Sequence, residues 1–315
     1  NMATAVPLIK MSNGSSIPAL GFGTWKAEPG VVGASVKIAI AEGFRHIDCA
    51  EGYGNEKEIG EALKEVFAEG KVKREDLFIT SKIWGSNFDI VEKRLKNSLT
   101  LLQIDYLDLY LLHCPSSFER TPEGGVAKDS EDFPKRGKTP IHMAWADMEK
   151  MVDAGLTKAI GVSNFSSLLI NDMLSYARIP PAVNQIEVSP YYTNEALAQW
   201  CLKVNVQVTA YCPLGVSAGV SICDEALKTT SVLQDELIVA IAKKHNATAA
   251  QVLLKWSIQK GYNVLSKSTK EHRIKENFSS RNVVLTDEEV KQITGLNKNW
   301  KVCNHATEFG VPVYN

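Results

Sequence analysis

Four side chains that can move protons or carry charge lie at the ends of apolar runs in this sequence: Asp48, Tyr53, Lys82 and His113. A tyrosine hydroxyl, with a pKa of about 10, is a weak acid at neutral pH. A neighbouring lysine ammonium lowers the tyrosine pKa, and a buried lysine needs a carboxylate to stay charged. A histidine nearby can donate a hydrogen bond to an oxygen on which negative charge develops. Side by side, the four would form a proton-donating site.

Each of the four also has an ordinary structural explanation. Taken alone, Asp48 could cap a helix, Tyr53 could pack in a loop, Lys82 could lie at the surface and His113 could be a satisfied core residue. The chemistry therefore depends on elements that bring these distant positions together.

Short β-branched and apolar runs alternate along the chain with longer segments of helical period, which is typical of βα units and a parallel sheet. Eight strands are predicted, at residues 21–24, 45–48, 77–82, 107–113, 157–163, 183–187, 207–211 and 263–266. Helical patterns lie between them, the clearest at residues 55–69, 90–102 and 139–153.

This count of strands, each leading into a helix, predicts an α/β fold, a (β/α)₈ TIM barrel formed by residues 1–315 as one domain. In such a barrel the carboxyl ends of the strands meet at one mouth, which makes distant residues neighbours. An open doubly wound sheet would require a glycine-rich phosphate turn after its first strand, and Gly21-Phe-Gly-Thr-Trp lacks the third glycine.

Further segments do not fit the bare repeat. Residues 8–11 and 16–18, joined around Asn13 and Gly14, predict an N-terminal β-hairpin. Residues 116–138 and 215–230 are long loops that follow strands, so they belong at the mouth of the barrel. A last helix is expected at 286–296, opened by the capping box Thr286-Asp-Glu-Glu, and the tail 297–315 has no periodicity.

The amino-acid composition limits the classes of molecule that the protein is expected to bind. Lys and Arg total 35 against 36 Asp and Glu, so no basic excess favours nucleic acid or an anionic membrane, and a small ligand fits better. The six cysteines form no CxxC pair, which indicates reduced thiols. The first residues lack a signal-peptide pattern and no apolar stretch is long enough to span a membrane. We expect a cytoplasmic protein that acts as a monomer.

Three stretches carry a family resemblance: Ile47-Asp-Cys-Ala-Glu-Gly-Tyr-Gly-Asn-Glu, Ile79-Thr-Ser-Lys-Ile-Trp and Leu111-Leu-His-Cys-Pro. They resemble the catalytic tetrad segments of the aldo-keto reductases, and the similarity continues through Gly161-Val-Ser-Asn-Phe, Ala182-Val-Asn-Gln-Ile-Glu, Thr209-Ala-Tyr-Cys-Pro-Leu-Gly and residues 267–278. It covers nearly the whole chain, and all the segments in order are far more specific than any one.

The resemblance implies an oxidoreductase of the aldose or aldehyde reductase kind, which reduces the carbonyl of a sugar, small aldehyde or ketone to an alcohol. Tyr53 would donate the proton, Lys82 would tune its acidity, Asp48 would hold Lys82, and His113 would orient the substrate oxygen. We refer to these four residues as the tetrad.

The hydride would come from a nicotinamide dinucleotide bound across the mouth, although the chain has no GxGxxG fingerprint. By resemblance, the nicotinamide side would be held by Ser163, Asn164, Gln185, Tyr211, Thr24, Trp25 and Asp48. Hydroxyl groups before a predicted helix indicate a phosphate site at the helix start, and by resemblance this phosphate is the 2′-phosphate of the cofactor, which favours NADPH over NADH. The matching positions are Lys267, Ser268, Thr269 and Arg273, with Glu276 and Asn277 near the adenine.

The chain departs from the family pattern in the segments that, by resemblance, would bind the phosphates of the cofactor. Ser266 stands where proline is frequent, and Cys212 stands where serine often follows the tyrosine. Val216 precedes Ser217 where a serine commonly follows Leu-Gly, so pyrophosphate contacts through Leu214 and Ser217 can be offset by one residue.

The resemblance also implies a substrate pocket lined by Trp25, Trp84, His113, Cys114, Phe118, Trp300 and Cys303. Aromatic walls around a few polar groups are usual for small-ligand sites. Cys114 stands where the family often has an aromatic residue after the histidine, and we expect this smaller side chain to widen the pocket.

Two other functions stay open at this point. Lys82 could form a Schiff base in an aldolase, but that would leave Tyr53 and the phosphate segment without a role. The chain could also be a weakly active NADPH-binding barrel with a structural or regulatory role, against which the complete tetrad argues. The remaining histidines show no metal-ligand spacing, and no metal is expected.

Overall fold

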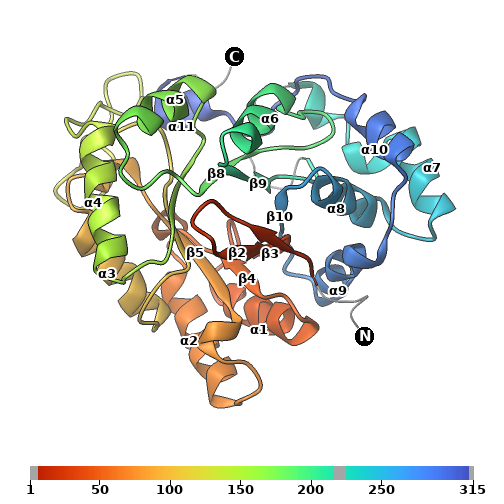
Figure 1. The fold of residues 1–315 in the computed structure, drawn as a ribbon, viewed down its shortest axis with the longest axis horizontal. Helices are drawn as coiled ribbons and strands as arrows, with labels where there is room; N and C mark the ends of the chain where they lie inside the picture. The colour runs from red at the N-terminus through yellow and green to blue at the C-terminus, as the bar shows by residue number, and fades with distance from the viewer. Residues whose placement is uncertain (1–5, 216–224, 312–315) are drawn as a thin grey trace.

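The computed structural model describes residues 6–215 and 225–311, and it contains a closed barrel of eight parallel strands with helices around it (Figure 1). The strands are β3 (Leu20–Gly23), β4 (His46–Asp48), β5 (Phe78–Ile83), β6 (Leu109–Leu112), β7 (Ile160–Ser163), β8 (Val183–Glu187), β9 (Gln207–Tyr211) and β10 (Asn263–Ser266). They follow one another in chain order, and β10 closes the barrel by pairing with β3. The predicted (β/α)₈ barrel is confirmed.

The strands are buried on both faces, as expected of a parallel sheet covered by helices. Every residue of β5 and β6 is buried, and so are the polar side chains that these strands carry to the mouth. Two strands are shorter than predicted, because Leu107 and Thr157 pair with each other only as an isolated bridge before β6 and β7 begin.

The surrounding helices are α1 (Val32–Glu42), α2 (Glu56–Ala68), α3 (Val91–Leu102), α4 (Ile141–Asp153), α5 (Ser167–Tyr176), α6 (Glu195–Lys203), α7 (Glu236–Lys244), α8 (Ala249–Gln259), α9 (Glu271–Ser279) and α10 (Asp287–Thr294). In α2 the predicted apolar face comprises Ile59, Leu63, Val66 and Phe67; the first three are buried and Phe67 is half-buried. The capping box before α10 is also confirmed, because Thr286 and Glu289 exchange hydrogen bonds between side chain and backbone.

The N-terminal hairpin closes one end of the barrel. Its strands β1 (Leu8–Lys10) and β2 (Ser16–Pro18) pair antiparallel, as predicted. Met11 and Ile17 pack with Phe78, Leu109 and other residues near the starts of the barrel strands. The mouth at the strand ends therefore remains as the place for a site.

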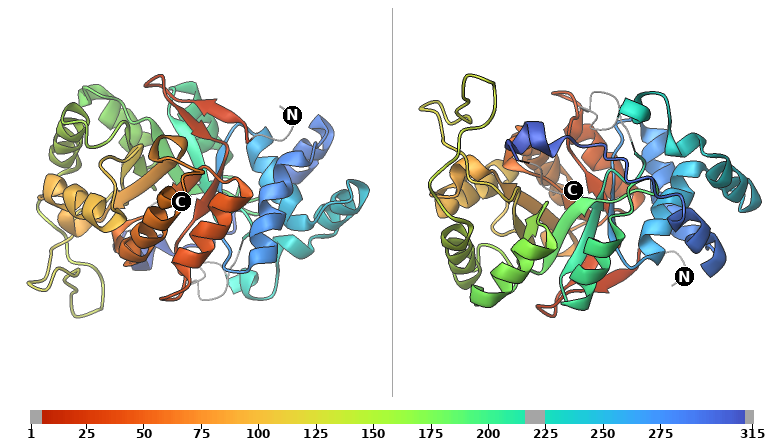
Figure 2. Two further views of the ribbon diagram at one scale, coloured as in Figure 1. Left: turned by 90° about the horizontal axis from the view of Figure 1, so that it is seen from below. Right: turned by 90° about the horizontal axis from the view of Figure 1, so that it is seen from above.

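The long loop at residues 116–138 has no helix and only isolated bridges, and it projects beyond the helices (Figure 2). The predicted loop 215–230 is described only in part, because residues 216–224 lie outside the described ranges; Glu225–Lys228 forms a 3₁₀ turn. The tail contains a short helix, α11 (His305–Phe309), that its lack of periodicity did not predict. Among the described residues, no helix has both the length and the apolar character that crossing a membrane requires.

Candidate active site

Lys82, at the end of β5, is the centre of a buried polar network. Its ammonium Nζ lies 2.5 Å from Asp48 Oδ1, and it donates to the carbonyl oxygen of Cys49 at 2.9 Å and to Tyr53 Oη at 3.2 Å. The side chains of Lys82 and Asp48 are 0 % and 3 % exposed. Three acceptors therefore surround the three protons of one ammonium group.

Burial and charge act in opposite directions on this network. Burial lowers the pKa of Lys82, but the charge of Asp48 and the hydrogen bonds to Asp48 and Tyr53 outweigh it, so the net pKa is raised and Lys82 stays charged. Burial raises the pKa of Tyr53 to about 12, although Lys82 opposes this. Lys82 lowers the pKa of Tyr53, as predicted, but the predicted net lowering is wrong because burial of the phenol outweighs the effect of Lys82.

His113, which follows β6, completes the group. Its ring lies edge-on to Tyr53, with centroids 5.6 Å apart. Burial, helped by the charge of Lys82, holds its pKa well below the usual range, so the imidazole is neutral. Its Nδ1 is buried without a hydrogen-bond partner among the described residues. The structure thus brings all four tetrad residues together, although it does not test their roles.

Glu51, which the sequence argument did not single out, fixes the segment that carries Tyr53. That segment is a 3₁₀ turn, η2 (Glu51–Tyr53), directly after β4. Glu51 accepts hydrogen bonds from the backbone N–H of Trp84 at 2.6 Å and from Asn87 Nδ2 at 2.9 Å, and it pairs with Arg94 at 2.5 Å. These contacts hold the turn against the end of β5, where Lys82 lies.

The residues expected around the nicotinamide form one connected set beside the tetrad. Gln185 Nε2 donates to Asp48 Oδ2 at 2.9 Å, and Ser163 Oγ donates to the carbonyl oxygen of Gln185 at 2.8 Å. Asn164 contacts Ser163 Oγ at 3.2 Å and receives a hydrogen bond from Tyr211 Oη at 2.7 Å. The strand ends β7, β8 and β9 therefore present amide and hydroxyl groups next to the acid.

The β3 side of the mouth carries two further predicted cofactor positions. Thr24 donates its hydroxyl to the carbonyl oxygen of Asp48 at 2.8 Å, and the Trp25 ring lies 6.4 Å from that of Tyr53. Both residues thus border the tetrad.

The predicted phosphate segment lies between β10 and α9. Lys267 Nζ donates to the carbonyl oxygen of Lys26 at 2.8 Å, which places it beside the loop after β3, and Ser268 Oγ accepts from the N–H of Lys270. No side chain caps the N-terminus of α9, and Arg273 is exposed on its first turn. An uncapped helix start with cations around it fits an anionic phosphate.

For the other predicted cofactor residues, the structure gives mainly their burial. Glu276 accepts from Thr248 at 2.8 Å and Asn277 is buried. Thr269 and Leu214 are half-buried, and Ser217 lies outside the described residues.

The predicted substrate residues fall into two groups. Trp84 lies 5.0 Å from the His113 ring and 6.0 Å from Phe118 (centroid distances), so these side chains form a wall beside the tetrad. Trp300 packs instead on Tyr191, at 5.8 Å. Cys114 is fully buried and its thiol donates to the carbonyl oxygen of Ser116, so the expected widening of the pocket stays a prediction.

The tail supplies residues near the site that the sequence argument missed. Phe309 of α11 packs on Trp84 and Phe118, with centroids 5.7 and 6.5 Å away, and stacks on His305 at 5.1 Å. His305 shares a 2.8 Å hydrogen bond with Tyr211 Oη. A helix of five residues is too short to show periodicity, which is why α11 gave no signal.

Glu187, at the end of β8, holds the tail in place. Its buried carboxylate accepts the backbone N–H groups of Val302 at 2.6 Å and Cys303 at 3.0 Å. Glu187 is an ionisable residue at the end of a predicted strand. The criterion by which the tetrad was chosen, an ionisable side chain at the end of an apolar run, could therefore have identified it.

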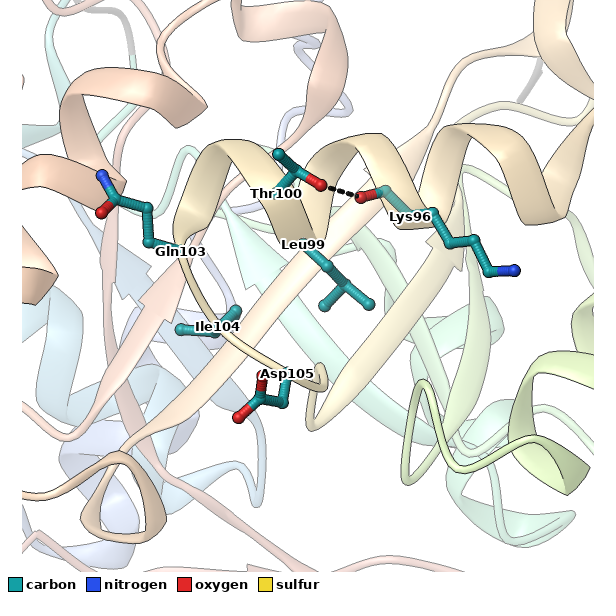
Figure 3. Close-up of a pocket in the computed structure, with 6 residues that line it drawn as sticks. All are labelled: Lys96, Leu99, Thr100, Gln103, Ile104 and Asp105. Carbon is teal, nitrogen blue, oxygen red and sulfur yellow. Dashed lines mark hydrogen bonds between the residues drawn. The ribbon is translucent and has the colours of Figure 1, made fainter.

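Two surface hollows lie away from this cluster. One is lined by residues at the end of α3 and in the following turn, shown in Figure 3: Lys96, Leu99, Thr100, Gln103, Ile104 and Asp105. That turn leads into the start of β6, at the end of the barrel opposite the mouth. The other lies between α8 and α10. Neither contains a tetrad residue.

Comparisons with known proteins all find similarity to aldo/keto reductases and aldose reductases. The sequence model of the Aldo/keto reductase family matches residues 19–298. "Aldose reductase B" of Dictyostelium discoideum is 42 % identical over 306 residues, with 95 % of each chain covered. "Aldo-keto reductase family 1 member A1" of Homo sapiens is 41 % identical over 303 residues, covering 94 % of this chain and 91 % of the relative. The solved structure of the aldose reductase from Schistosoma japonicum superposes with a TM-score of 0.89 at 38 % identity, covering 98 % of each chain.

Proposed function

The chain belongs to the aldo/keto reductase family, and from this premise we propose that it is an NADPH-dependent reductase of aldehyde or ketone carbonyls, with Tyr53 as proton donor. Its substrates would be sugars or other small carbonyl compounds. The observation that carries the proposal is the Lys82 ammonium held between Asp48 and Tyr53, at 2.5 and 3.2 Å.

When bound, the dihydronicotinamide supplies the hydride that reduces the carbonyl carbon. The protein's part is to donate a proton to the carbonyl oxygen. Tyr53, with its pKa raised to about 12, keeps its proton at neutral pH and is ready to give it. An oxygen that receives negative charge as hydride arrives becomes an alkoxide, which is a far stronger base than phenolate, so transfer from Tyr53 is favourable. The Lys82 ammonium then stabilises the phenolate left behind.

His113 would orient the substrate. Because its imidazole is neutral, it can donate one N–H to the carbonyl oxygen and place no second cation beside Lys82. The Trp84 ring, 5.0 Å from His113, would form an apolar wall for the rest of the substrate.

The choice of NADPH is supported by the segment from Lys267 to Arg273. It combines cations, hydroxyl groups and the uncapped start of α9, which suits a 2′-phosphate. The carboxamide would lie among Ser163, Asn164 and Gln185, with Tyr211 on the ring. One-domain organisation, a monomeric state and a cytoplasmic location remain predictions.

The aldolase alternative is disfavoured by the surroundings of Lys82. A Schiff base requires a neutral amine with a free lone pair, whereas Lys82 is charged, fully buried and bonded to three acceptors. Trapping of a carbonyl compound on Lys82 by borohydride without nicotinamide would support it. A binding-only role would be supported if NADPH quenched tryptophan fluorescence but no carbonyl were reduced.

The direct test follows NADPH oxidation with sugars, sugar phosphates, aliphatic and aromatic aldehydes, and ketosteroids. Tyr53→Phe should lower turnover roughly 10²- to 10⁴-fold, the usual contribution of a positioned acid, while NADPH still quenches the tryptophan fluorescence. Tyr110→Phe is a matched control, because it removes a buried phenol hydroxyl that has no hydrogen-bond partner among the described residues. Comparable rates for Tyr53→Phe and the wild type would remove Tyr53 as the acid.

A further inference from the structure

Two thiols from distant parts of the chain meet at the mouth of the barrel. Cys212 directly follows β9 and Cys303 lies in the tail, 91 residues later, yet their sulfur atoms are 4.0 Å apart. Neither thiol donates a proton in the proposed reduction, although Cys303 is one of the residues predicted to line the substrate pocket.

The backbone on each side holds this pair in place. Cys212 has a φ of 51°, in the left-handed region that non-glycine residues rarely adopt, and its carbonyl oxygen accepts the N–H of Gly215 in a tight turn. On the other side, the buried Glu187 carboxylate accepts the backbone N–H of Cys303. The short sulfur–sulfur distance is therefore set by two anchored segments.

Three other cysteines have the character of inert core thiols. Burial raises the pKa of Cys49 well above its usual range, that of Cys114 to about 12 and that of Cys201 to about 11. All three are buried, whereas Cys212 is half-buried, which makes it the more exposed residue of the pair because Cys303 is buried. The sixth cysteine, Cys223, lies outside the described residues.

We propose that Cys212 and Cys303 are an oxidation site that forms a reversible disulfide when the protein meets a peroxide. Cys212 loses its proton and its sulfur attacks one peroxide oxygen, which breaks the O–O bond and gives a sulfenic acid; the hydroxide released takes up that proton and leaves as water. Cys303 then attacks that sulfur and displaces a second water. The two sulfurs together lose two electrons and two protons, and hydrogen peroxide is reduced to two waters. The sulfur atoms must approach from 4.0 Å to about 2.05 Å.

Such a bond would tie the tail to the end of β9. Cys212 follows Tyr211, to which His305 is already hydrogen-bonded, and the same tail brings Phe309 against Trp84. Oxidation would thus fix one wall of the mouth. This effect on activity rests on the proposed function, whereas formation of the disulfide does not.

The bond itself is tested on the full chain with hydrogen peroxide, without any activity measurement. Reduced protein has six thiols, and we expect four after oxidation, counted in denaturant and restored by dithiothreitol. Trypsin leaves Cys212 and Cys223 in one peptide, from Val204 to Lys228, so the link to the Cys303 peptide is assigned by mass spectrometry in a Cys223→Ser background. The control is Cys212→Ser, which restores the hydroxyl common at this position in the family.

The outcomes are distinct. A link in the wild type and in Cys223→Ser, but not in Cys212→Ser, supports the proposal. A link that persists in Cys212→Ser, six unchanged thiols, or sulfinic acids without a link would overturn it.

For activity, we expect carbonyl reduction by the wild type to fall on oxidation and recover with dithiothreitol, and Cys212→Ser to resist the treatment. A confirmed link with unchanged kinetics would overturn only the effect on the mouth, and absence of any carbonyl reduction in the reduced protein would count against the proposed function alone.

Discussion

Replacing Asp48 by asparagine keeps the shape of the side chain and removes its charge, which makes it a sharp test of the buried ion pair. In the structure, Asp48 supplies the only full negative charge among the three acceptors around Lys82 Nζ, at 2.5 Å. The carbonyl oxygen of Cys49 and the hydroxyl of Tyr53 would remain. The substitution therefore isolates the role of the carboxylate charge.

The expected loss of stability is large. At 2.5 Å and an effective dielectric constant of about 20, the attraction between the two charges is about 7 kcal/mol. Part of it is recovered, because an asparagine oxygen can still accept a hydrogen bond from Lys82. Removing one partner of a buried pair usually costs about 3–5 kcal/mol, and we expect a loss of that size in the free energy of unfolding.

The pH dependence of stability should change as well. In the wild type the folded-state pKa of Lys82 is raised above its unfolded value of about 10.4. The stability that Lys82 contributes is therefore fully present below that unfolded pKa, and it is lost only as the pH rises through the higher folded-state pKa. Without Asp48, burial dominates and lowers the folded pKa of Lys82. The unfolded chain then binds more protons than the folded one, so the stability of Asp48→Asn should rise with pH up to about 10.

Urea unfolding followed by tryptophan fluorescence between about pH 7 and pH 10 measures both effects. Glu92→Gln is the control, because it breaks an ion pair with Lys96 in which both side chains are 59 % exposed, and it should leave the free energy of unfolding nearly unchanged. The reasoning is refuted if Asp48→Asn loses no more stability than this control, or if its stability does not rise with pH.

Three further changes test other parts of the molecule. Arg273→Ala should weaken NADPH binding roughly 10- to 100-fold and NADH binding far less, measured by fluorescence titration, and equal losses would contradict the 2′-phosphate assignment. Gly60→Ala should destabilise the fold by about 1–3 kcal/mol in urea unfolding, because a Cβ there would lie 2.1 Å from the carbonyl oxygen of Leu101 in the neighbouring helix; a gain in stability would show that α2 and α3 can move apart. Cys114→Trp should disfavour bulky aldehydes relative to short ones in kcat/KM, with circular dichroism to check folding because Cys114 is fully buried. Unchanged selectivity would count against a role for Cys114 in the pocket.

The barrel could be predicted from the sequence because the pattern that indicates it, a short apolar strand followed by an amphipathic helix, is local and repeated along the chain. Each strand is a short buried run and each main helix has an amphipathic face, as α2 shows with Ile59, Leu63 and Val66. The tetrad could be predicted to meet because strand ends converge in this fold. Family resemblance supplied the roles, which geometry alone does not test.

What the sequence could not show depends on contacts between distant segments. The net pKa of Tyr53 depends on how much of the phenol is buried, and no local pattern reports that. The position of α11 depends on the hydrogen bonds from the tail to Glu187 and Tyr211, each made across about a hundred residues of chain or more. The approach of Cys212 to Cys303 is of the same kind.

The N-terminal hairpin has a consequence for solvent. Because the buried side chains of Met11 and Ile17 cover the far end of the barrel, we expect water to approach the Lys82–Asp48 pair from the mouth. The hydration of that pair, and with it the local dielectric constant, is therefore set by what covers the open side. We therefore expect a substitution in α11 that lets water in or keeps it out to change the acidity of Tyr53.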